Sequence, residues 1–101
     1  MAQPVYKLWT ARPREAWYQL SQDERNSLMA RVIAALEKVG AKSVVLCDGS
    51  WSSEQWLFFG IEEYPDIEAV QAHAHLLNEI QWFRYVESTT ALGSALELST
   101  S

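Results

Sequence analysis

The order of hydrophobic and polar residues along the chain predicts four β-strands. Residues 5–10 are rich in β-branched and aromatic side chains and run into Ala11-Arg12-Pro13, where we expect the first strand to end. The second apolar run is closed by the turn pair Asp48-Gly49, and the third is closed by Pro65. The predicted strands therefore cover residues 5–10, 43–47, 55–64 and 83–90.

Two segments between these strands have the spacing of amphipathic helices. Ser21 and Glu24 form a capping-box pattern, and apolar residues then recur at helical intervals up to the stop signal Gly40. Asp66 is a good N-cap for a second helix, whose apolar positions are Ile67, Val70, Ala74, Leu77 and Ile80. We also expect a short helical turn within residues 14–20.

This order of elements predicts an α+β domain of the ferredoxin-like βαββαβ type. Such a domain has one four-stranded antiparallel sheet with two helices on one face. The strands do not alternate cleanly between apolar and polar residues, because large apolar side chains occupy both faces of the third strand. The face without helices therefore needs an apolar cover, and a second copy of the chain is the simplest one. We expect a homodimer formed through the open sheet face.

The sequence also resembles a known superfamily over roughly residues 5–88. The run 67–73, Ile-Glu-Ala-Val-Gln-Ala-His, and the run 82–85, Trp-Phe-Arg-Tyr, are similar to the helix and closing strand of small dimeric α+β barrels. These include olivetolic acid cyclase and the antibiotic-biosynthesis monooxygenases. The Tyr-x-Leu-Trp-Thr start and the Glu-Tyr-Pro-Asp exit of the third strand resemble an uncharacterised bacterial family. The resemblance implies two sheets packed face to face with the helices outside.

Length, composition and charge limit the class of protein. The 101 residues fit one domain, which we expect over 1–93, followed by a C-terminal tail over 94–101. The net charge of −5 gives no basic surface for nucleic acid or an anionic membrane. The single cysteine, Cys47, has no internal partner, and the start of the chain does not have the pattern of a secretory signal. We therefore expect a cytoplasmic protein with no nucleic-acid or membrane partner.

The two histidines, His73 and His75, lie on the second predicted helix. Steps of 100° from Ile67 place His73 near 240° and His75 near 80°, whereas the apolar stripe is centred near 290°. The pair therefore cannot hold one metal ion, and His75 is expected in solvent. His73 lies on the shoulder of the stripe, where cyclases of the olivetolic type have a tyrosine that lines the pocket. It is either the acid or base of a reaction or an ordinary buried histidine.

Further site candidates come from the strands and their ends. Asp48 would have to lie beside His73 to orient or charge it as a second catalytic residue, although an Asp-Gly pair is equally typical of a plain turn. Lys7 could anchor an anionic group or simply extend its stem along the sheet. The remaining expected pocket residues are aromatic or apolar, and each could instead serve only for packing. Together, the expected pocket residues are Tyr6, Lys7, Trp9, Phe59, Leu77 and Tyr85.

Three functions are compatible with these residues. The first is a cofactor-independent cyclase, isomerase or monooxygenase-like enzyme that acts on a small aromatic or polyketide-like molecule with His73 as acid or base. The second is a haem-binding or haem-degrading protein with His73 as axial ligand, which the resemblance to the superfamily suggests. The third is a dimer that binds a small molecule without changing it. The chain shows no phosphate-binding glycine loop, zinc pattern or nucleophile elbow, so no cofactor or metal is implied.

Overall fold

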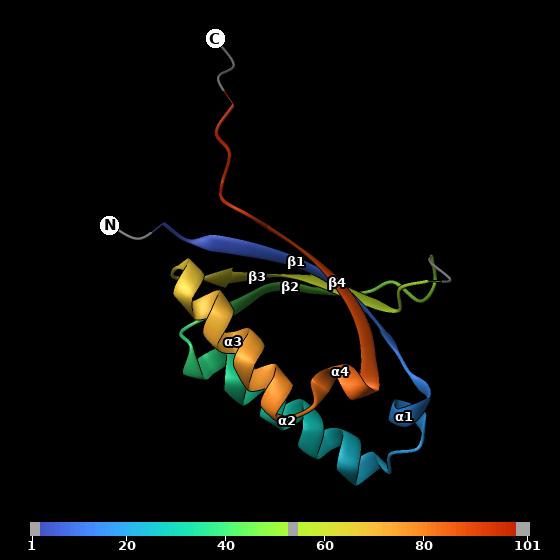
Figure 1. Cartoon of the computed structure of the whole chain (residues 1–101). Helices are drawn as coiled ribbons and strands as arrows, with labels where there is room; N and C mark the ends of the chain where they lie inside the picture. The colour runs from blue at the N-terminus through green and yellow to red at the C-terminus, as the bar shows by residue number, and fades with distance from the viewer. Residues whose placement is uncertain (1–2, 53–54, 99–101) are drawn as a thin grey trace.

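The computed structural model describes residues 3–52 and 55–98 and has a four-stranded sheet with helices packed beneath it (Figure 1). The elements in chain order are β1 (Val5–Pro13), α1 (Glu15–Tyr18), α2 (Gln22–Lys38), β2 (Lys42–Asp48), β3 (Phe58–Tyr64), α3 (Ile67–Glu79), α4 (Trp82–Tyr85) and β4 (Val86–Gly93). None of the helices in these two ranges is long and apolar enough to cross a bilayer.

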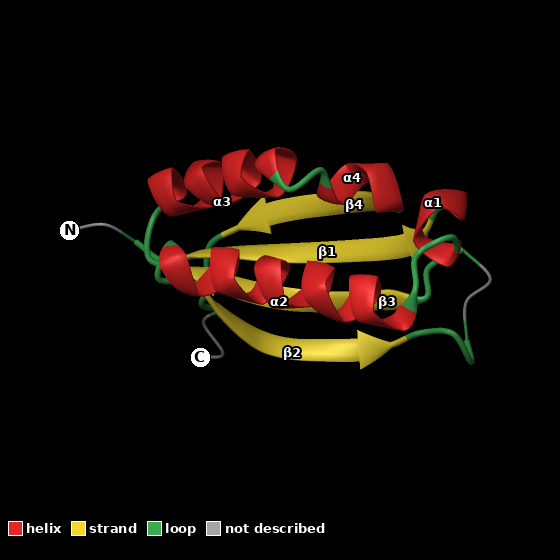
Figure 2. Ribbon diagram, turned by 90° about the horizontal axis from the view of Figure 1, so that it is seen from below, coloured by secondary structure: helices red, strands yellow, loops and turns green. Residues whose placement is uncertain are grey.

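The sheet has the strand order β2-β3-β1-β4, and every neighbouring pair is antiparallel. The two long helices, α2 and α3, each follow one of the two central strands and lie on the same face, as the view from the helix side shows (Figure 2). This is the ferredoxin-like arrangement, so the α+β fold class expected from the sequence is confirmed.

Local sequence signals fix the ends of both long helices. The Ser21 hydroxyl accepts the amide hydrogen of Glu24 at 3.1 Å, and the Glu24 carboxylate accepts that of Ser21 at 2.9 Å. The capping box therefore satisfies two free amides at the start of α2. Gly40 takes the left-handed conformation, with φ of 76°, just after the end of α2. The Asp66 carboxylate caps α3 by accepting the amide hydrogen of Ala69 at 2.8 Å.

Several strand boundaries differ from those that the sequence predicts. β1 continues to Pro13 because its last residues pair with β4. β3 begins at Phe58, not at residue 55. Residues 83–85, predicted as part of the last strand, lie in the helical turn α4, which follows a left-handed turn at Gln81 with φ of 60°. β4 then continues to Gly93, and residues 94–98 contain no helix or strand. The last three residues of the predicted tail lie outside the described ranges.

Successive side chains of each strand point to opposite faces of the sheet, one covered by the helices and one open. Lys7, Trp9 and Ala11 of β1 point to the helices, and Tyr6 and Leu8 point away. A small apolar cluster holds the two helices to the covered face; it consists of Ala41, Tyr64, Ala69 and Val70, with Val5, Leu36 and Val39 packed against it.

The open face of the sheet keeps large apolar side chains in contact with solvent. Leu8, Val45 and Phe59 are all exposed there, and none of the described helices covers them (Figure 1). A shallow hollow of about 570 Å³ runs over this face between Tyr6, Leu8 and Ile61 and the chain that leaves β4.

Gly60 is a position at which the sheet tolerates no side chain. A Cβ there would lie 2.7 Å from the Val45 carbonyl oxygen and 3.1 Å from the Trp9 indole ring. We expect Gly60→Ala to lower the free energy of unfolding by roughly 1–3 kcal/mol in urea titrations, because two neighbours must move.

Gly93→Ala is the matched control for this substitution. Gly93 also lies in a strand, has no positive φ, and a Cβ added there meets nothing within 4 Å. The two variants should therefore differ clearly in stability, and equal losses would contradict the close approach of Trp9 to Gly60.

Candidate functional site

Four polar side chains meet between α3 and the centre of the sheet. Lys7 comes from β1, Glu62 and Tyr64 from β3, and His73 from α3. Lys7 pairs directly with Glu62, and Val5 with Tyr64, so the two-residue period of the strands puts all three polar side chains on the helix-covered face. They are strongly shielded: the exposed fractions are 0% for Tyr64, 2% for His73 and 9% for Lys7.

His73 lies at the centre of the buried side of α3. The buried residues of this helix are Ala69, Val70, His73 and Leu77, and their mean direction is about 250° on the scale that starts at Ile67. The sequence placed His73 on the shoulder of the apolar stripe because Ala74 was counted as buried and Ala69 was not, whereas Ala74 is exposed and Ala69 is buried. His75 is exposed, as expected.

A hydrogen-bond chain runs from Glu62 through Tyr64 to His73. The Tyr64 hydroxyl donates its only proton to the Glu62 carboxylate at 2.6 Å. Its oxygen lies 2.9 Å from Nδ1 of His73, so it must accept a hydrogen from that nitrogen. With this donor assignment Nδ1 carries the ring proton, the Lys7 ammonium 3.4 Å from Nδ1 makes no hydrogen bond to it, and Nε2 of a neutral His73 has a free lone pair.

Burial and charge keep His73 neutral at physiological pH. Desolvation, and then the nearby positive charge of Lys7, lower the pKa of His73 to about 4. Desolvation also lowers the pKa of Lys7, although its Nζ lies 3.7 Å from the Glu62 carboxylate, which opposes that shift. Burial and the bond to Glu62 raise the pKa of Tyr64, so the phenol keeps its proton.

Nε2 of His73 has no hydrogen-bond partner. Within residues 3–52 and 55–98 it is the one buried side-chain nitrogen or oxygen in this condition. An unpaired buried polar atom costs roughly 1–3 kcal/mol, and native proteins contain few of them. The ring is thus held through Nδ1, while Nε2 keeps a lone pair and, with a pKa of about 4, is a weak base.

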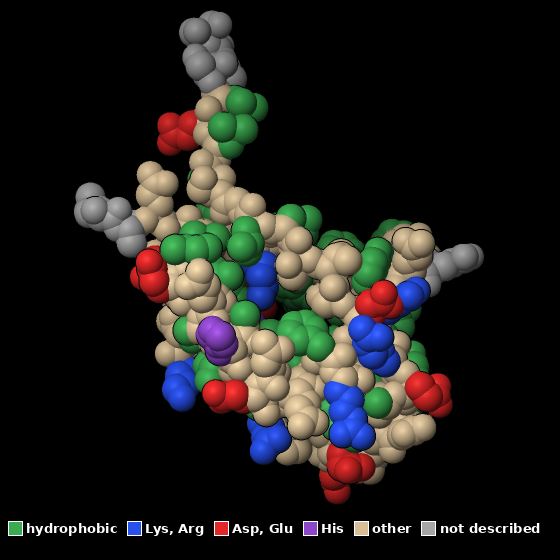
Figure 3. All heavy atoms as spheres, in the orientation of Figure 1, with side chains coloured by type: hydrophobic (Ala, Val, Ile, Leu, Met, Phe, Trp, Pro, Cys, Tyr) green, Lys and Arg blue, Asp and Glu red, His purple; other side chains and the backbone are tan. Residues whose placement is uncertain are grey.

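An apolar cavity of about 250 Å³ lies on the same face of the sheet. All nine of its lining side chains are apolar, and three of them are Trp9, Trp17 and Trp82. Trp17 and Trp82 meet edge to face, with ring centroids 6.5 Å apart, and so connect α1 with α4. Figure 3 shows the surface hollowed between the sheet and the helices, with cationic and hydrophobic side chains inside the hollow.

The cavity and the polar cluster occupy neighbouring rows of the sheet. Ala11 and Phe58 form one pair of the register and both line the cavity. The next pair on this face is Trp9 with Gly60, and Lys7 with Glu62 follows. Rows on one face are roughly 7 Å apart along a strand. The Trp9 indole, which lies over Gly60, stands in the row between the two parts of the site, and none of the four polar side chains lines the cavity.

The other predicted catalytic residue, Asp48, lies apart from His73. Asp48 pairs with Phe58, six residues before Tyr64 on β3 and thus roughly 20 Å away, and its carboxylate accepts the amide hydrogen of Ser50 in a turn. The structure therefore does not bring Asp48 beside His73.

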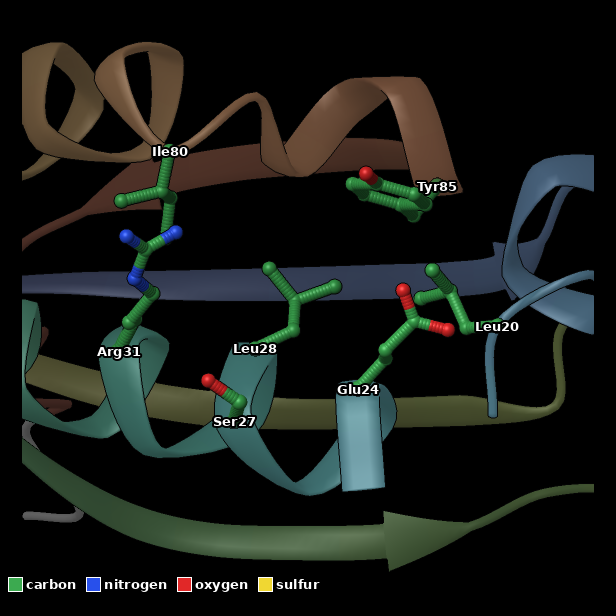
Figure 4. A pocket seen from close by; sticks show the side chains of 7 residues that line it. All are labelled: Leu20, Glu24, Ser27, Leu28, Arg31, Ile80 and Tyr85. Atoms are coloured by element: carbon green, nitrogen blue, oxygen red, sulfur yellow. The ribbon is translucent and has the colours of Figure 1, made fainter. Parts of the chain in front are cut away.

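The predicted pocket residues divide among several surfaces. Lys7 and Trp9 lie at the site described above, and Leu77 is buried one helical turn after His73. Tyr6 and Phe59 point to the open face of the sheet. Tyr85 lines a separate groove of about 200 Å³ between α2 and α4, where it lies above Glu24 and Leu28 (Figure 4).

Sequence reasoning missed Glu62 and Tyr64 as members of the site. A signal was present, because the two-residue period of a strand puts Glu62 and Tyr64 on one face of the third strand. What the sequence lacked was the register with β1, which puts Glu62 opposite Lys7. In the described part of the chain no group of three or more metal-binding side chains forms, and the polar cluster contains a single histidine.

The depressed pKa of His73 makes the stability of the fold depend on pH. The ordinary pKa of 6.5 applies in the unfolded chain, so the unfolded state binds this proton more readily between pH 6.5 and about 4. The contribution of neutral His73 to the free energy of unfolding is therefore fully present above pH 6.5. Roughly 3 kcal/mol of it is lost as the pH falls toward 4. Urea titrations should show a smaller loss over this window for His73→Gln than for the wild type. Parallel curves for the two proteins would contradict the shift.

Comparison with known proteins places the chain among relatives whose function is not established. A crystal structure of a protein of unknown function from Rhodopseudomonas palustris is similar with a TM-score of 0.65 and 19% identity, over 97% of this chain and 86% of that one. At this identity the likeness supports the fold alone. None of the curated proteins matches the chain. One family model matches residues 3–101, and the chain therefore belongs to the family described as "Family of unknown function (DUF6616)".

Proposed function

We propose that this protein is a cofactor-independent enzyme that moves a proton on a small aromatic or polyketide-like molecule, with His73 as acid and base. The observation that carries the proposal is the buried, unpartnered Nε2 of a neutral His73 whose Nδ1 is held by Tyr64. An isomerase, a cyclase or a monooxygenase-like reaction that begins with removal of a proton needs such a nitrogen.

The neighbouring groups fit the charges that would develop during the reaction. When Nε2 takes a proton, the hydrogen bonds through Tyr64 to the Glu62 carboxylate are already formed, whereas burial and the charge of Lys7 oppose the imidazolium. His73 is therefore a weak base, which suits a C–H group that the substrate itself acidifies. The substrate then becomes an anion, and the cation nearest to the imidazole is Lys7, whose Nζ lies 3.4 Å from Nδ1. Return of the proton to another atom of the substrate completes an isomerisation.

The cavity favours a small aromatic ligand. Its wall is wholly apolar and contains three indole rings, which offer faces and edges for stacking. Its volume of about 250 Å³ lies below the roughly 300–1,000 Å³ of sites for drug-sized ligands. A molecule of one or two fused rings fits this volume, whereas a haem does not. The geometry therefore favours an aromatic substrate over the haem-binding alternative, even though Nε2 could ligate iron.

The exposed apolar side chains of the open face support the proposal of a homodimer. Leu8, Val45 and Phe59 form part of a face that a second copy would cover, as in the dimeric α+β barrels that the sequence resembles. Sheet-to-sheet packing would leave the helix-covered site of each copy outside the interface. We also propose a cytoplasmic setting, which suits the single free Cys47.

Solvent hydrogen exchange tests His73 as the base without knowledge of the natural substrate. Aryl ketones and arylacetones have a C–H group next to a carbonyl, and its exchange in D₂O is followed by the loss of a proton NMR signal. We expect the wild type to accelerate exchange of at least one such compound, and His73→Asn to lower the rate about 100-fold or more.

His75→Asn is the matched control for this test, since it changes the other histidine of the same helix, which is exposed. This variant should accelerate hydrogen exchange of the test compound as strongly as the wild type does. Wild-type rates in His73→Asn would refute the proposal. Ligand binding detected by tryptophan fluorescence, without any acceleration of exchange, would instead favour the non-catalytic binding protein.

Light scattering tests the homodimer at micromolar concentration. We expect the wild type to have the mass of two chains and Leu8→Lys to have the mass of one. The new charge would be buried in the interface, beside Ile61 and Ala91 on the neighbouring strands of the same sheet. Ile33→Lys replaces an equally exposed apolar residue on α2 and should remain dimeric. A monomeric wild type would contradict the proposal.

A further inference from the structure

Lys7 differs from the other lysines of the chain in its surroundings. The sequence contains only three, Lys7, Lys38 and Lys42, and the last two are exposed. Lys7 instead reaches into the interior with 9% of its surface exposed. A buried lysine on the central strand of a sheet is rare unless it is paired or used.

Three groups of the candidate site surround its amine. Nζ of Lys7 lies 3.7 Å from the Glu62 carboxylate, 3.4 Å from Nδ1 of His73 and 5.4 Å from the centroid of the Tyr64 ring. The carboxylate is therefore at ion-pair distance from the amine. Burial lowers the pKa of Lys7 against the opposing effect of Glu62, which increases the fraction of uncharged, nucleophilic amine.

The apolar cavity begins at the next position on the same face. Trp9 follows Lys7 by two residues, lines the cavity, and keeps polar groups out of its wall. Lys7 does not line the cavity, so a flat apolar molecule bound there reaches the amine only when the Trp9 indole between them moves aside. Imine formation requires an uncharged amine, groups that donate and accept protons, and a binding site for the apolar part of the carbonyl compound.

We propose that Lys7 is the reactive amine of this site and forms an imine with an aldehyde or ketone attached to a small aromatic group. This inference rests on the proposed function, because it names the substrate class and a covalent step for the same site. It also assigns Lys7 a role that an anchoring cation does not have.

The step is balanced without an oxidant or reductant. The Lys7 ammonium first passes a proton to Glu62, and the lone pair of Nζ then attacks the carbonyl carbon while the C=O electron pair moves to oxygen. A proton moves from Nζ to that oxygen to give the carbinolamine, and the proton held by Glu62 then lets the hydroxyl leave as water. The product is a protonated C=N bond with Glu62 again a carboxylate, and addition of water reverses the reaction. In the iminium form the neighbouring C–H is acidified, and Nε2 of His73 is the base within the same cluster that can remove its proton.

Reductive trapping tests the inference on the unmodified full-length chain. Benzaldehyde is the probe, because it has a carbonyl on one aromatic ring and no exchangeable C–H next to it. Sodium cyanoborohydride at pH 7 converts any imine into a stable benzyl amine, and peptide mass mapping locates it. We expect labelling of Lys7 at least about tenfold faster than that of Lys38 and Lys42, because burial lowers the pKa of the Lys7 amine and so raises its uncharged fraction at pH 7.

Labelling of the exposed lysines defines the results that would overturn the inference. Benzylation of Lys38 and Lys42 while Lys7 reacts only after unfolding in urea would overturn the inference and leave Lys7 as a structural partner of Glu62. Equal rates at all three lysines would also overturn it. Lys7→Met should lose the fast label and Lys42→Arg should keep it, with folding checked by circular dichroism. The mapping of the wild type holds even where Lys7→Met does not fold.

His73→Asn separates this inference from the proposed function. Trapping of benzaldehyde needs the amine but no removal of a C–H proton, so this variant should still label Lys7. If labelling is fast and solvent exchange of aryl ketones is absent, the imine is confirmed and the base role of His73 fails. If exchange depends on His73 but Lys7 is never labelled, the proposed function stands and the amine role of Lys7 fails.

Discussion

The contact between Tyr64 and His73 is the interaction on which the rest of the site depends. These are the largest fully buried side chains in the described part of the chain, and their polar atoms meet at 2.9 Å. A buried hydroxyl and a buried imidazole are tolerated only where their hydrogen bonds are made. Their contact therefore fixes both the rotation of α3 over the sheet and the proton on Nδ1. From that proton follow the free Nε2 and the chemistry proposed for it.

The same contact explains why a helix of modest apolar character packs where it does. Ala69 and Val70 bring α3 to the sheet, but His73 stands at the centre of its buried side. A purely apolar stripe would set the helix by hydrophobic burial alone, with the rotation that the sequence predicts. The observed rotation instead buries the methyl group of Ala69 in place of that of Ala74 and brings His73 to Tyr64. The hydrogen bond between His73 and Tyr64 is therefore made without a net loss of buried methyl groups.

The fold could be predicted from the sequence wherever local chemistry decides it. The capping box at Ser21, the left-handed Gly40 and the N-cap Asp66 are each contained in a few adjacent residues, and all three are confirmed. The turn at Gln81 was missed because a non-glycine residue there gives no signal for a positive φ. The strand predicted over residues 83–85 failed for a related reason. Aromatic residues favour strands in isolation, but the edge-to-face packing of Trp82 on Trp17 is a tertiary contact that holds this segment in a helical turn.

The site was predictable only in part. Some of its residues can be recognised within one helix, whereas others come together only when the strands pair. The importance of His73 could be seen from one helix, whereas Glu62 joins it only through the pairing of β1 with β3. The apolar cavity is separated from Lys7 and Glu62 by the Trp9 indole. This ring can lie across the sheet because Gly60 has no side chain. With a larger residue there, the indole would have to rise toward the helices and into the space that the cavity now occupies. The glycine thus keeps apolar volume and polar chemistry adjacent but separate, the arrangement that a substrate with an aromatic body and a reactive polar end requires.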